Sequence, residues 1–206
     1  MRLEDPLDDL FQNRSHVRVL RALVGLPRGI DASIREIARR AGITHPTASA
    51  ILDSLKVQGL VVARATLLAS EYRLNDGHVL SPRLEELFRF ESRLRQDVIT
   101  FVADELGTRA PWVKEAYLFG SAVRGEMRPD SDLDIAVIST PGKATRLASI
   151  MEDVGQDTAD RFGNRVQAVI GTKPIAELAA RGQRGFRLWR EIAKDGIRVW
   201  PPAGEA

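Results

Sequence analysis

Cysteine is absent from the 206 residues, and histidine occurs only three times. The absence of cysteine excludes disulfide bonds, thiolate nucleophiles and cysteine-ligated zinc or iron–sulfur sites, and three histidines leave little for a histidine-rich metal site. No apolar run approaches the roughly 18 residues that a membrane span needs. The N-terminal sequence MRLEDPLDDLF is acidic where a secretory signal is basic and then apolar. We therefore expect a cytoplasmic, globular protein with no membrane partner.

A strong net charge is also lacking. The 30 Lys and Arg residues stand against 28 Asp and Glu, which gives a formal charge of +2 and argues neither for nor against a nucleic-acid partner. Between residues 33 and 64, however, the sequence has five basic residues and two acidic ones, which predicts a modest basic patch. The length fits one large domain or two small ones.

The first third of the chain has the pattern of a small helical unit. An Asp-Pro pair predicts a helix from about residue 6 to residue 25. Ser33 and Glu36 stand in the S-x-x-E capping relation, and Gly42 is a helix stop, so a short helix is predicted from about 34 to 41. The apolar residues at helical spacing in the first helix are Leu7, Leu10, Phe11, Val17, Leu20 and Val24.

A third helix and a hairpin are predicted next. Thr44 is a suitable N-cap, Pro46 is tolerated in the first helical turn, and Gly59 follows the last apolar position. The β-prone runs 60–65 and 71–74 are separated by a few residues, as in a hairpin. The expected buried stripe of the third helix is Ala48, Ile51, Leu52 and Leu55.

The order helix, short helix, glycine turn, helix, hairpin resembles the MarR/ArsR-like winged-helix DNA-binding domains over about residues 8–76, above all in IREIARRAGITHPTASAILDSLKVQGLV. The resemblance implies a double-stranded DNA partner, with a recognition helix in the major groove, basic groups on phosphates, and a homodimer that spans two half-sites. Solvated residues on a protein-interaction module remain the alternative. The expected DNA-binding residues are Thr44, His45, Thr47 and Ser49 at base edges or phosphates, and Arg39, Arg40, Lys56 and Arg64 at phosphates.

A long helix is predicted after the turn Asn75-Asp76-Gly77, starting at Ser81-Pro82 and stopping at Gly107. Such a helix can be the first element of a second domain or can pack against its twin in a dimer. The residues that suit a dimer seam are Leu84, Leu87, Phe88 and Leu94.

Strands alternating with helices follow Gly107, which indicates an α/β or α+β domain. A short apolar strand at 116–119 runs into Gly120-Ser121, and a second strand covers 133–138. Between them the sequence YLFGSAVRGEMRPDSDLDIAVI contains G-S-x10-D-x-D, which ends in Asp132 and Asp134.

This spacing has a chemical rationale. Alternation along a strand places Asp132 and Asp134 on one face, with Cα atoms about 7 Å apart, so both carboxylates reach one hard cation. Mg²⁺ is usually held by one or two carboxylates together with substrate phosphates. Gly120 allows close backbone approach and Ser121 adds a hydroxyl beside exposed N–H groups, which is a phosphate cradle. The reaction class that these groups imply is nucleotidyl transfer.

The segment from about 95 to 200 resembles the nucleotidyltransferase superfamily that includes DNA polymerase β, and more closely its minimal bacterial and archaeal branch. The matching residues are Gly120, Ser121, Asp132 and Asp134, with Arg124-Gly125-Glu126 after the first pair and RLWREIAKDGIRVW near the C-terminus. The resemblance implies Mg²⁺ or Mn²⁺, a nucleoside triphosphate such as ATP as ligand or substrate, Arg124 beside the nucleotide, and a helical toxin-like protein partner.

One position departs from that family. Active members usually place a third carboxylate on the following strand, and here that strand is 165–170, RVQAVI, with Gln167 at the matching position. An amide can take no proton and supplies no charge to a metal. The predicted solvated residues of the second domain are Asp153, Asp157 and Asp160, and most of Lys143, Arg146, Lys173, Arg181, Arg184, Arg187 and Arg190, some of which could contact a triphosphate or a nucleic-acid acceptor.

The sequence therefore predicts an α+β protein in which a winged helix-turn-helix domain (1–80) and a connecting helix (81–107) precede a nucleotidyltransferase-like domain with a small mixed sheet (108–206). Three functions stay open: a DNA-binding regulator that binds Mg-nucleotide, a working nucleotidyltransferase, and an antitoxin-like interaction protein with a weakened catalytic site.

Overall fold

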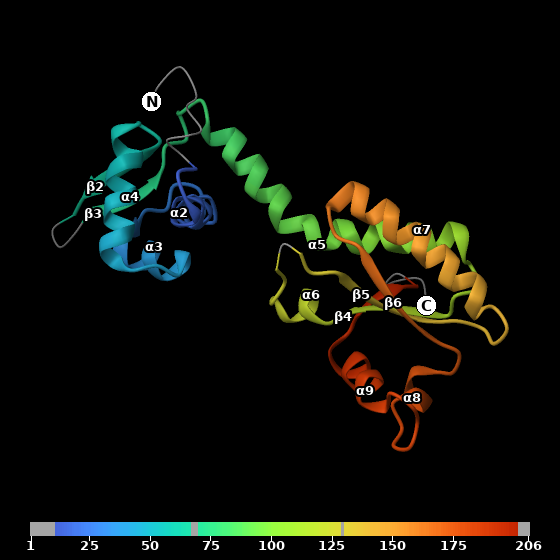
Figure 1. The fold of residues 1–206 in the computed structure, drawn as a ribbon. Coiled ribbons are helices and arrows are strands. Elements are labelled where there is room, and N and C mark those ends of the chain that lie inside the picture. The colour runs from blue at the N-terminus through green and yellow to red at the C-terminus, as the bar shows by residue number, and fades with distance from the viewer. Residues whose placement is uncertain (1–10, 67–69, 129, 202–206) are drawn as a thin grey trace. The chain divides into compact units, whose positions relative to one another are not determined.

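The computed structural model describes residues 11–66, 70–128 and 130–201 (Figure 1). The chain divides into two compact units, Met1–Arg93 and Leu94–Ala206. Across the described ranges, no helix has both the length and the apolar character that a bilayer crossing requires.

The first described helix is α2 (Arg14–Val24). It begins later than predicted, because the Oδ1 atom of Asn13 accepts hydrogen bonds from the backbone N–H groups of Ser15 (2.9 Å) and His16 (3.2 Å) and caps the helix there. Residues 11–13 form bends, so the prediction of one continuous helix from residue 6 is wrong in this part. The predicted Asp5-Pro6 start, with Leu7 and Leu10, lies outside the described residues.

The next two helices confirm their predicted caps. Helix α3 (Ile34–Ala41) starts where Ser33 Oγ accepts from the Glu36 N–H at 3.3 Å and ends at Gly42, whose φ of 62° is left-handed. Helix α4 (His45–Val57) starts where Thr44 Oγ1 accepts from the Thr47 N–H at 3.4 Å.

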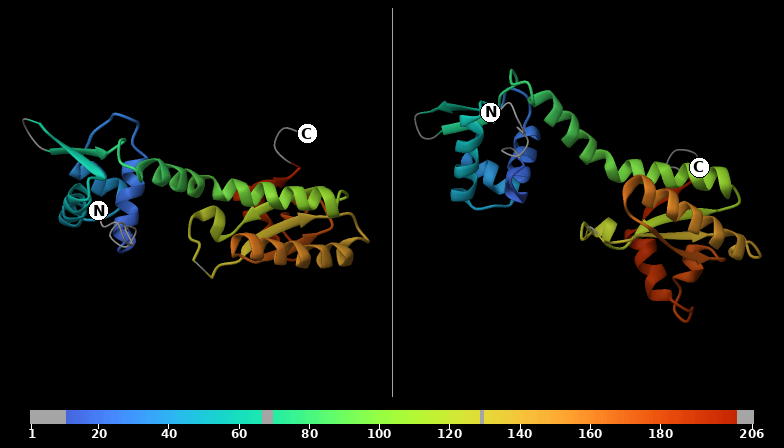
Figure 2. Two further views of the ribbon diagram at one scale, coloured as in Figure 1. Left: turned by 90° about the horizontal axis from the view of Figure 1, so that it is seen from above. Right: turned by 45° about the horizontal axis from the view of Figure 1, so that its top comes forward.

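A small sheet completes the first unit. The strands β2 (Val61–Ala65) and β3 (Ser70–Leu74) are antiparallel, as the hairpin prediction expected (Figure 2). Strand β1 (Ala32–Ser33) pairs with the other side of β3, which gives the order β1-β3-β2. Two residues leave no periodic signal, so the sequence did not predict β1.

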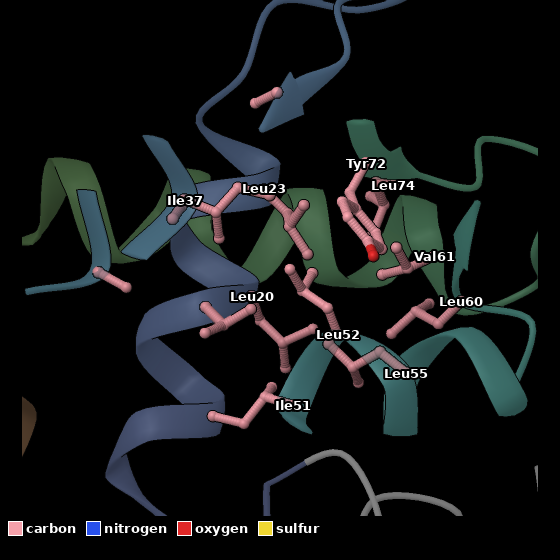
Figure 3. Packing of buried hydrophobic residues seen from close by; sticks show 14 of the residues in the cluster. Leu20, Leu23, Ile37, Ile51, Leu52, Leu55, Leu60, Val61, Tyr72 and Leu74 are labelled. Atoms are coloured by element: carbon pink, nitrogen blue, oxygen red, sulfur yellow. The ribbon is translucent and has the colours of Figure 1, made fainter. Parts of the chain in front are cut away.

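The core of the first unit lies among α2, α4 and the hairpin (Figure 3). The long helix α5 (Ser81–Arg109) contributes Leu84 and Phe88, whose side chains are only 4% and 7% exposed. These two residues, expected at a dimer seam, therefore belong to this core, because positions four apart share one helix face. The residues labelled in Figure 3 are Leu20, Leu23, Ile37, Ile51, Leu52, Leu55, Leu60, Val61, Tyr72 and Leu74.

Helix α5 continues two residues past its predicted stop at Gly107. A Cβ atom on Gly107 would lie 3.0 Å from the Trp200 ring. The glycine is thus explained by close packing of the indole, whose Nε1 donates to the Val113 carbonyl at 3.0 Å. The role of Gly107 is contact with an aromatic ring rather than helix termination.

The second unit contains a mixed sheet in the order β6-β5-β4-β7, in which β5 and β6 are parallel and the other pairs antiparallel. The confirmed fold class is α+β, with a winged helix followed by an α/β domain with a small mixed sheet. The elements are β4 (Glu115–Phe119), α6 (Ser121–Arg124), β5 (Leu133–Ile138), α7 (Ala144–Phe162), β6 (Val166–Gly171), α8 (Ile175–Leu178), α9 (Phe186–Asp195) and β7 (Ile197–Trp200).

Helices cover both faces of this sheet (Figures 1 and 2). The second half of α5 and α7 pack on the face that carries Leu133, Ile135 and Val137 of β5. The alternate residues Ala136 and Ile138 pack with α9 on the opposite face. Residues of even number on β5 therefore face α9, and Asp134 is one of them.

Candidate functional site

The end of β4 meets the beginning of β5 at Gly120. Phe119 pairs with Asp134 across the two strands. Gly120 has φ 73° and ψ −147°, and a Cβ atom there would lie 2.1 Å from Asp134 Oδ2. Only glycine fits this backbone conformation and this contact. The Asp134 carboxylate is thus held against the start of the turn that leads into α6.

Two acidic residues concentrate negative charge at this point. Burial raises the pKa of the Asp134 carboxyl above its ordinary range, the charge of Asp132 adds to the rise, and the Arg124 guanidinium opposes it. Asp132 is exposed and directly precedes β5, whereas Asp134 is partly buried. Strand alternation places Asp134 on the α9 face of the sheet, and the charge of Asp132 reaches it. A bound cation would relieve the repulsion between the two carboxylates.

Gln167 lies beside this pair. In the parallel register of β5 and β6, Asp134 is the partner of Gln167, which is exposed. Gln167 alternates with Val169, which packs toward α9, so it belongs to the same sheet face as Asp134. The site therefore has the Asp134 carboxylate and the Gln167 amide on paired strand positions, with Asp132 two residues before Asp134.

The acids of α7 are placed elsewhere. Helix α7 covers the opposite face of the sheet, and Asp157 on it accepts a hydrogen bond from Arg109 at 2.6 Å. Asp160 accepts from Gln156 on the same helix at 2.8 Å. Asp153 is exposed. None of the three can replace the missing third carboxylate beside Gln167.

The donor set fits a divalent cation that arrives with its substrate. Within the described ranges, no group of three or more His, Cys, Asp or Glu side chains could hold a metal alone. Mg²⁺ commonly takes only one or two carboxylates and completes its octahedron with water and phosphate oxygens. The pair Asp132 and Asp134 supplies two such carboxylates.

The turn after Gly120 supplies polar groups. The partly buried Ser121 begins the one-turn helix α6, and its carbonyl accepts from the Glu126 N–H at 3.0 Å. Arg124 is exposed, and its Nε donates to Glu126 at 2.8 Å. The Arg124 charge stays close enough to Asp134 to oppose its pKa rise.

A cavity of about 590 Å³ opens beside Gly120 on the α9 face. This volume is in the range of small-molecule and cofactor sites. The sequence left Arg190 open between solvent and a contact with triphosphate or nucleic acid, and it did not point to Lys194, because no local pattern links α9 to β4. The lining residues are Phe119, Gly120, Val123, Arg124, Arg190, Glu191, Lys194, Asp195 and Gly196.

The N-terminus of α4 carries most residues predicted to read DNA. Thr44, His45 and Thr47 are exposed, and the Thr44 and Thr47 hydroxyls lie 2.8 Å apart. Ser49 is partly buried, and Lys56 is exposed one residue before the helix ends. Short polar side chains at the beginning of such a helix suit base edges and phosphates.

The predicted phosphate contacts differ in charge compensation. Glu36 forms ion pairs with Arg39 at 2.7 Å and Arg40 at 2.5 Å, and these hydrogen bonds lower the pKa of Glu36 to about 2. Arg64 on β2 lies 4.0 Å from Asp31, with its side chain 78% exposed. The positive charge of Arg64 is therefore less compensated by a neighbouring carboxylate than that of Arg39 or Arg40.

Comparisons with known proteins match a different family model in each unit. Residues 13–66 match the model of the MarR family, and residues 99–176 match that of the nucleotidyltransferase domain. No curated protein matches the chain.

Two solved structures are similar over part of the chain. One is described as a toxin-antitoxin with AMP-PNP; it is 21% identical, with a TM-score of 0.35, over 50% of this chain and 72% of that one. The other is a mutant of the toxin-antitoxin MntA-HpeT; it is 19% identical, with a TM-score of 0.36, over 50% and 72%.

Proposed function

Because this chain joins a MarR-family winged helix to a nucleotidyltransferase domain, we propose that its first unit binds double-stranded DNA and its second binds an Mg²⁺–nucleoside triphosphate. The protein is then a DNA-binding regulator with a nucleotide site. The observation that supports the nucleotide site most strongly is the contact between Gly120 and the Asp134 carboxylate. The Asp134 carboxylate lies against the turn that, in this proposal, forms the phosphate cradle.

Each residue of the site has a role in this proposal. Asp132 and Asp134 hold Mg²⁺ or Mn²⁺, and the metal, when bound, neutralises phosphate charge and orients the phosphate oxygens. Backbone N–H groups after Gly120 and the Ser121 hydroxyl donate to the phosphates. Arg124 adds a positive charge at the rim of the cavity.

The chemistry that such a site supports is nucleotidyl transfer. An acceptor hydroxyl oxygen forms a bond to the α-phosphorus, the bond from the α-phosphorus to the bridging oxygen breaks, and pyrophosphate leaves with that electron pair. The hydroxyl proton passes to water, because the Gln167 amide accepts none. We therefore expect nucleotide binding to be retained and transfer to be slow.

Calorimetry with the four ribonucleoside triphosphates and Mg²⁺ tests the proposal. Wild-type protein should bind at least one of them, and Asp132→Ala should lose the Mg²⁺-dependent part of that affinity. Asp153→Ala is the matched control, since it removes one exposed carboxylate from α7 on the other face of the sheet. Equal affinities in all three proteins would contradict the nucleotide site.

The DNA part of the proposal has its own test. Arg64→Ala should weaken binding to a duplex selected from a random pool and lower the salt slope by about 0.9, the value for one lost phosphate contact. Arg146→Ala, a change at an exposed position on α7 in the second unit, is the control. Duplex binding that is insensitive to Arg64→Ala would contradict a contact between the β2–β3 hairpin and DNA.

A further inference from the structure

Four arginines recur at every third position before and along α9. We call these residues, Arg181, Arg184, Arg187 and Arg190, the arginine strip. All four are exposed. None of them forms an ion pair with any residue that the structure describes, whereas Arg109 and Arg124 do. These guanidinium groups can therefore bind an anion without first breaking an ion pair within the protein.

The arginine strip leads to the proposed nucleotide site. A second cavity, of about 500 Å³, is lined by Arg181, Phe186, Arg187, Arg190 and Glu191. Arg190 and Glu191 also line the cavity beside Gly120. The two hollows are therefore adjacent, and a ligand chain lying along the strip reaches the phosphate cradle.

The strip also contains an aromatic ring. Phe186 is partly buried, and the Arg190 guanidinium carbon lies 5.5 Å from its ring centroid. Aromatic rings and guanidinium planes are the groups on which unpaired bases stack, while arginines bind phosphates bidentately. Together they are a surface for single-stranded nucleic acid.

We propose that the arginine strip binds a single-stranded polynucleotide whose terminal hydroxyl is the acceptor at the nucleotide site. This inference rests on the proposed function. Residues 181–195 carry five basic side chains against two acidic ones, Glu191 and Asp195, so the surface favours a polyanion. Phe186 favours nucleic acid over an acidic peptide, because a peptide carboxylate gains nothing from a stacking ring.

Fluorescence anisotropy on the full chain, with labelled 20-mers of uridine and of thymidine, tests the proposal. The double variant Arg181→Ala and Arg187→Ala should weaken binding about tenfold and lower the salt slope by about 1.4, or about 0.7 for each lost contact with a single strand. A preference between the two oligomers identifies RNA or DNA as the ligand. The matched control is Arg95→Ala with Arg146→Ala, which removes two exposed cations from α5 and α7.

All variants keep the winged helix, so the difference between them isolates the strip. Equal binding of both oligomers by the strip variant, the control and wild type would overturn the proposal. Displacement of the 20-mers by polyglutamate at equal charge concentration would also overturn it and assign the surface to an acidic protein. The strip variant should still bind Mg²⁺-nucleotide in calorimetry, so failure of the strip is distinguishable from failure of the nucleotide site.

Discussion

Position 120 accommodates only a glycine, because its φ is positive and the Asp134 carboxylate occupies the space of a Cβ atom. The sequence motif predicted which residues gather here. It could not show that one carboxylate is pressed against the turn or that its pKa is raised, since both effects depend on the antiparallel pairing of β4 with β5. The acidic pair therefore costs stability in the absence of a cation.

Gly120→Ala tests the contact. The change should destabilise the protein by about 1–3 kcal/mol through the backbone conformation alone, and by more through the clash with Asp134. Gly125→Ala is the matched control, since Gly125 has the same φ of 73° and a Cβ atom added to it would meet nothing within 4 Å. Urea unfolding should show a larger loss for Gly120→Ala, and equal losses would contradict the contact.

Asp134→Asn should stabilise the protein at neutral pH in the presence of a chelator. The raised pKa means that the folded state holds the proton more tightly than the unfolded state, so ionisation of Asp134 costs stability. The cost grows as the pH rises from the unfolded pKa to the folded pKa and is complete above the latter. Thermal unfolding should show the variant's advantage at pH 7 and its disappearance below the ordinary Asp pKa; an advantage independent of pH would contradict the assignment.

At the scale of elements, caps and periodicity predicted most of the helices and strands. Ser33, Thr44 and Gly42 have the capping roles expected of them. The start of α2 was mispredicted, because Asn13 competes with the earlier Asp-Pro signal. The cavity that joins α9 to β4 could not be predicted, because it depends on how a helix packs across a sheet rather than on any local pattern.

Because β5 pairs with β6, a carboxylate at position 167 would lie beside Asp134, and its effect on transfer can be tested. Gln167→Glu introduces a carboxylate of the same shape beside Asp134, so it should tighten Mg²⁺ binding and speed transfer about 100-fold, as a general base typically does. The measurement is pyrophosphate release from nucleoside triphosphate with a 20-mer acceptor. Gln96→Glu, the same change at an exposed position on α5, should have no effect. A rate unchanged by Gln167→Glu would place the reacting atoms away from β6.

At the scale of the whole molecule, we propose that two copies of the chain pair through α5. Leu87 and Phe90 are 49% and 51% exposed and lie three positions apart on one side of the helix. Of the residues predicted to form the dimer interface, Leu87 and Leu94 are exposed and stay in it, whereas Leu84 and Phe88 are buried. Phe90, which is exposed, takes their place. A dimer would present two recognition helices to two half-sites.

Leu87→Glu with Phe90→Glu should convert a dimer to a monomer in sedimentation and weaken duplex binding about 100-fold or more through the loss of the second half-site contact. Ile30→Glu with Val79→Glu is the matched control, since it places two charges on exposed apolar residues outside α5. A wild-type protein that sediments as a monomer at micromolar concentration would contradict the dimer.

The most direct test of the nucleotide site is a crystal structure with Mg²⁺ and a non-hydrolysable nucleoside triphosphate. We expect a cation between the carboxylates of Asp132 and Asp134, with the phosphates against the backbone of Gly120 and Ser121. Carboxylates that turn away from each other, or a nucleotide bound elsewhere with these two acids uncoordinated, would contradict the site.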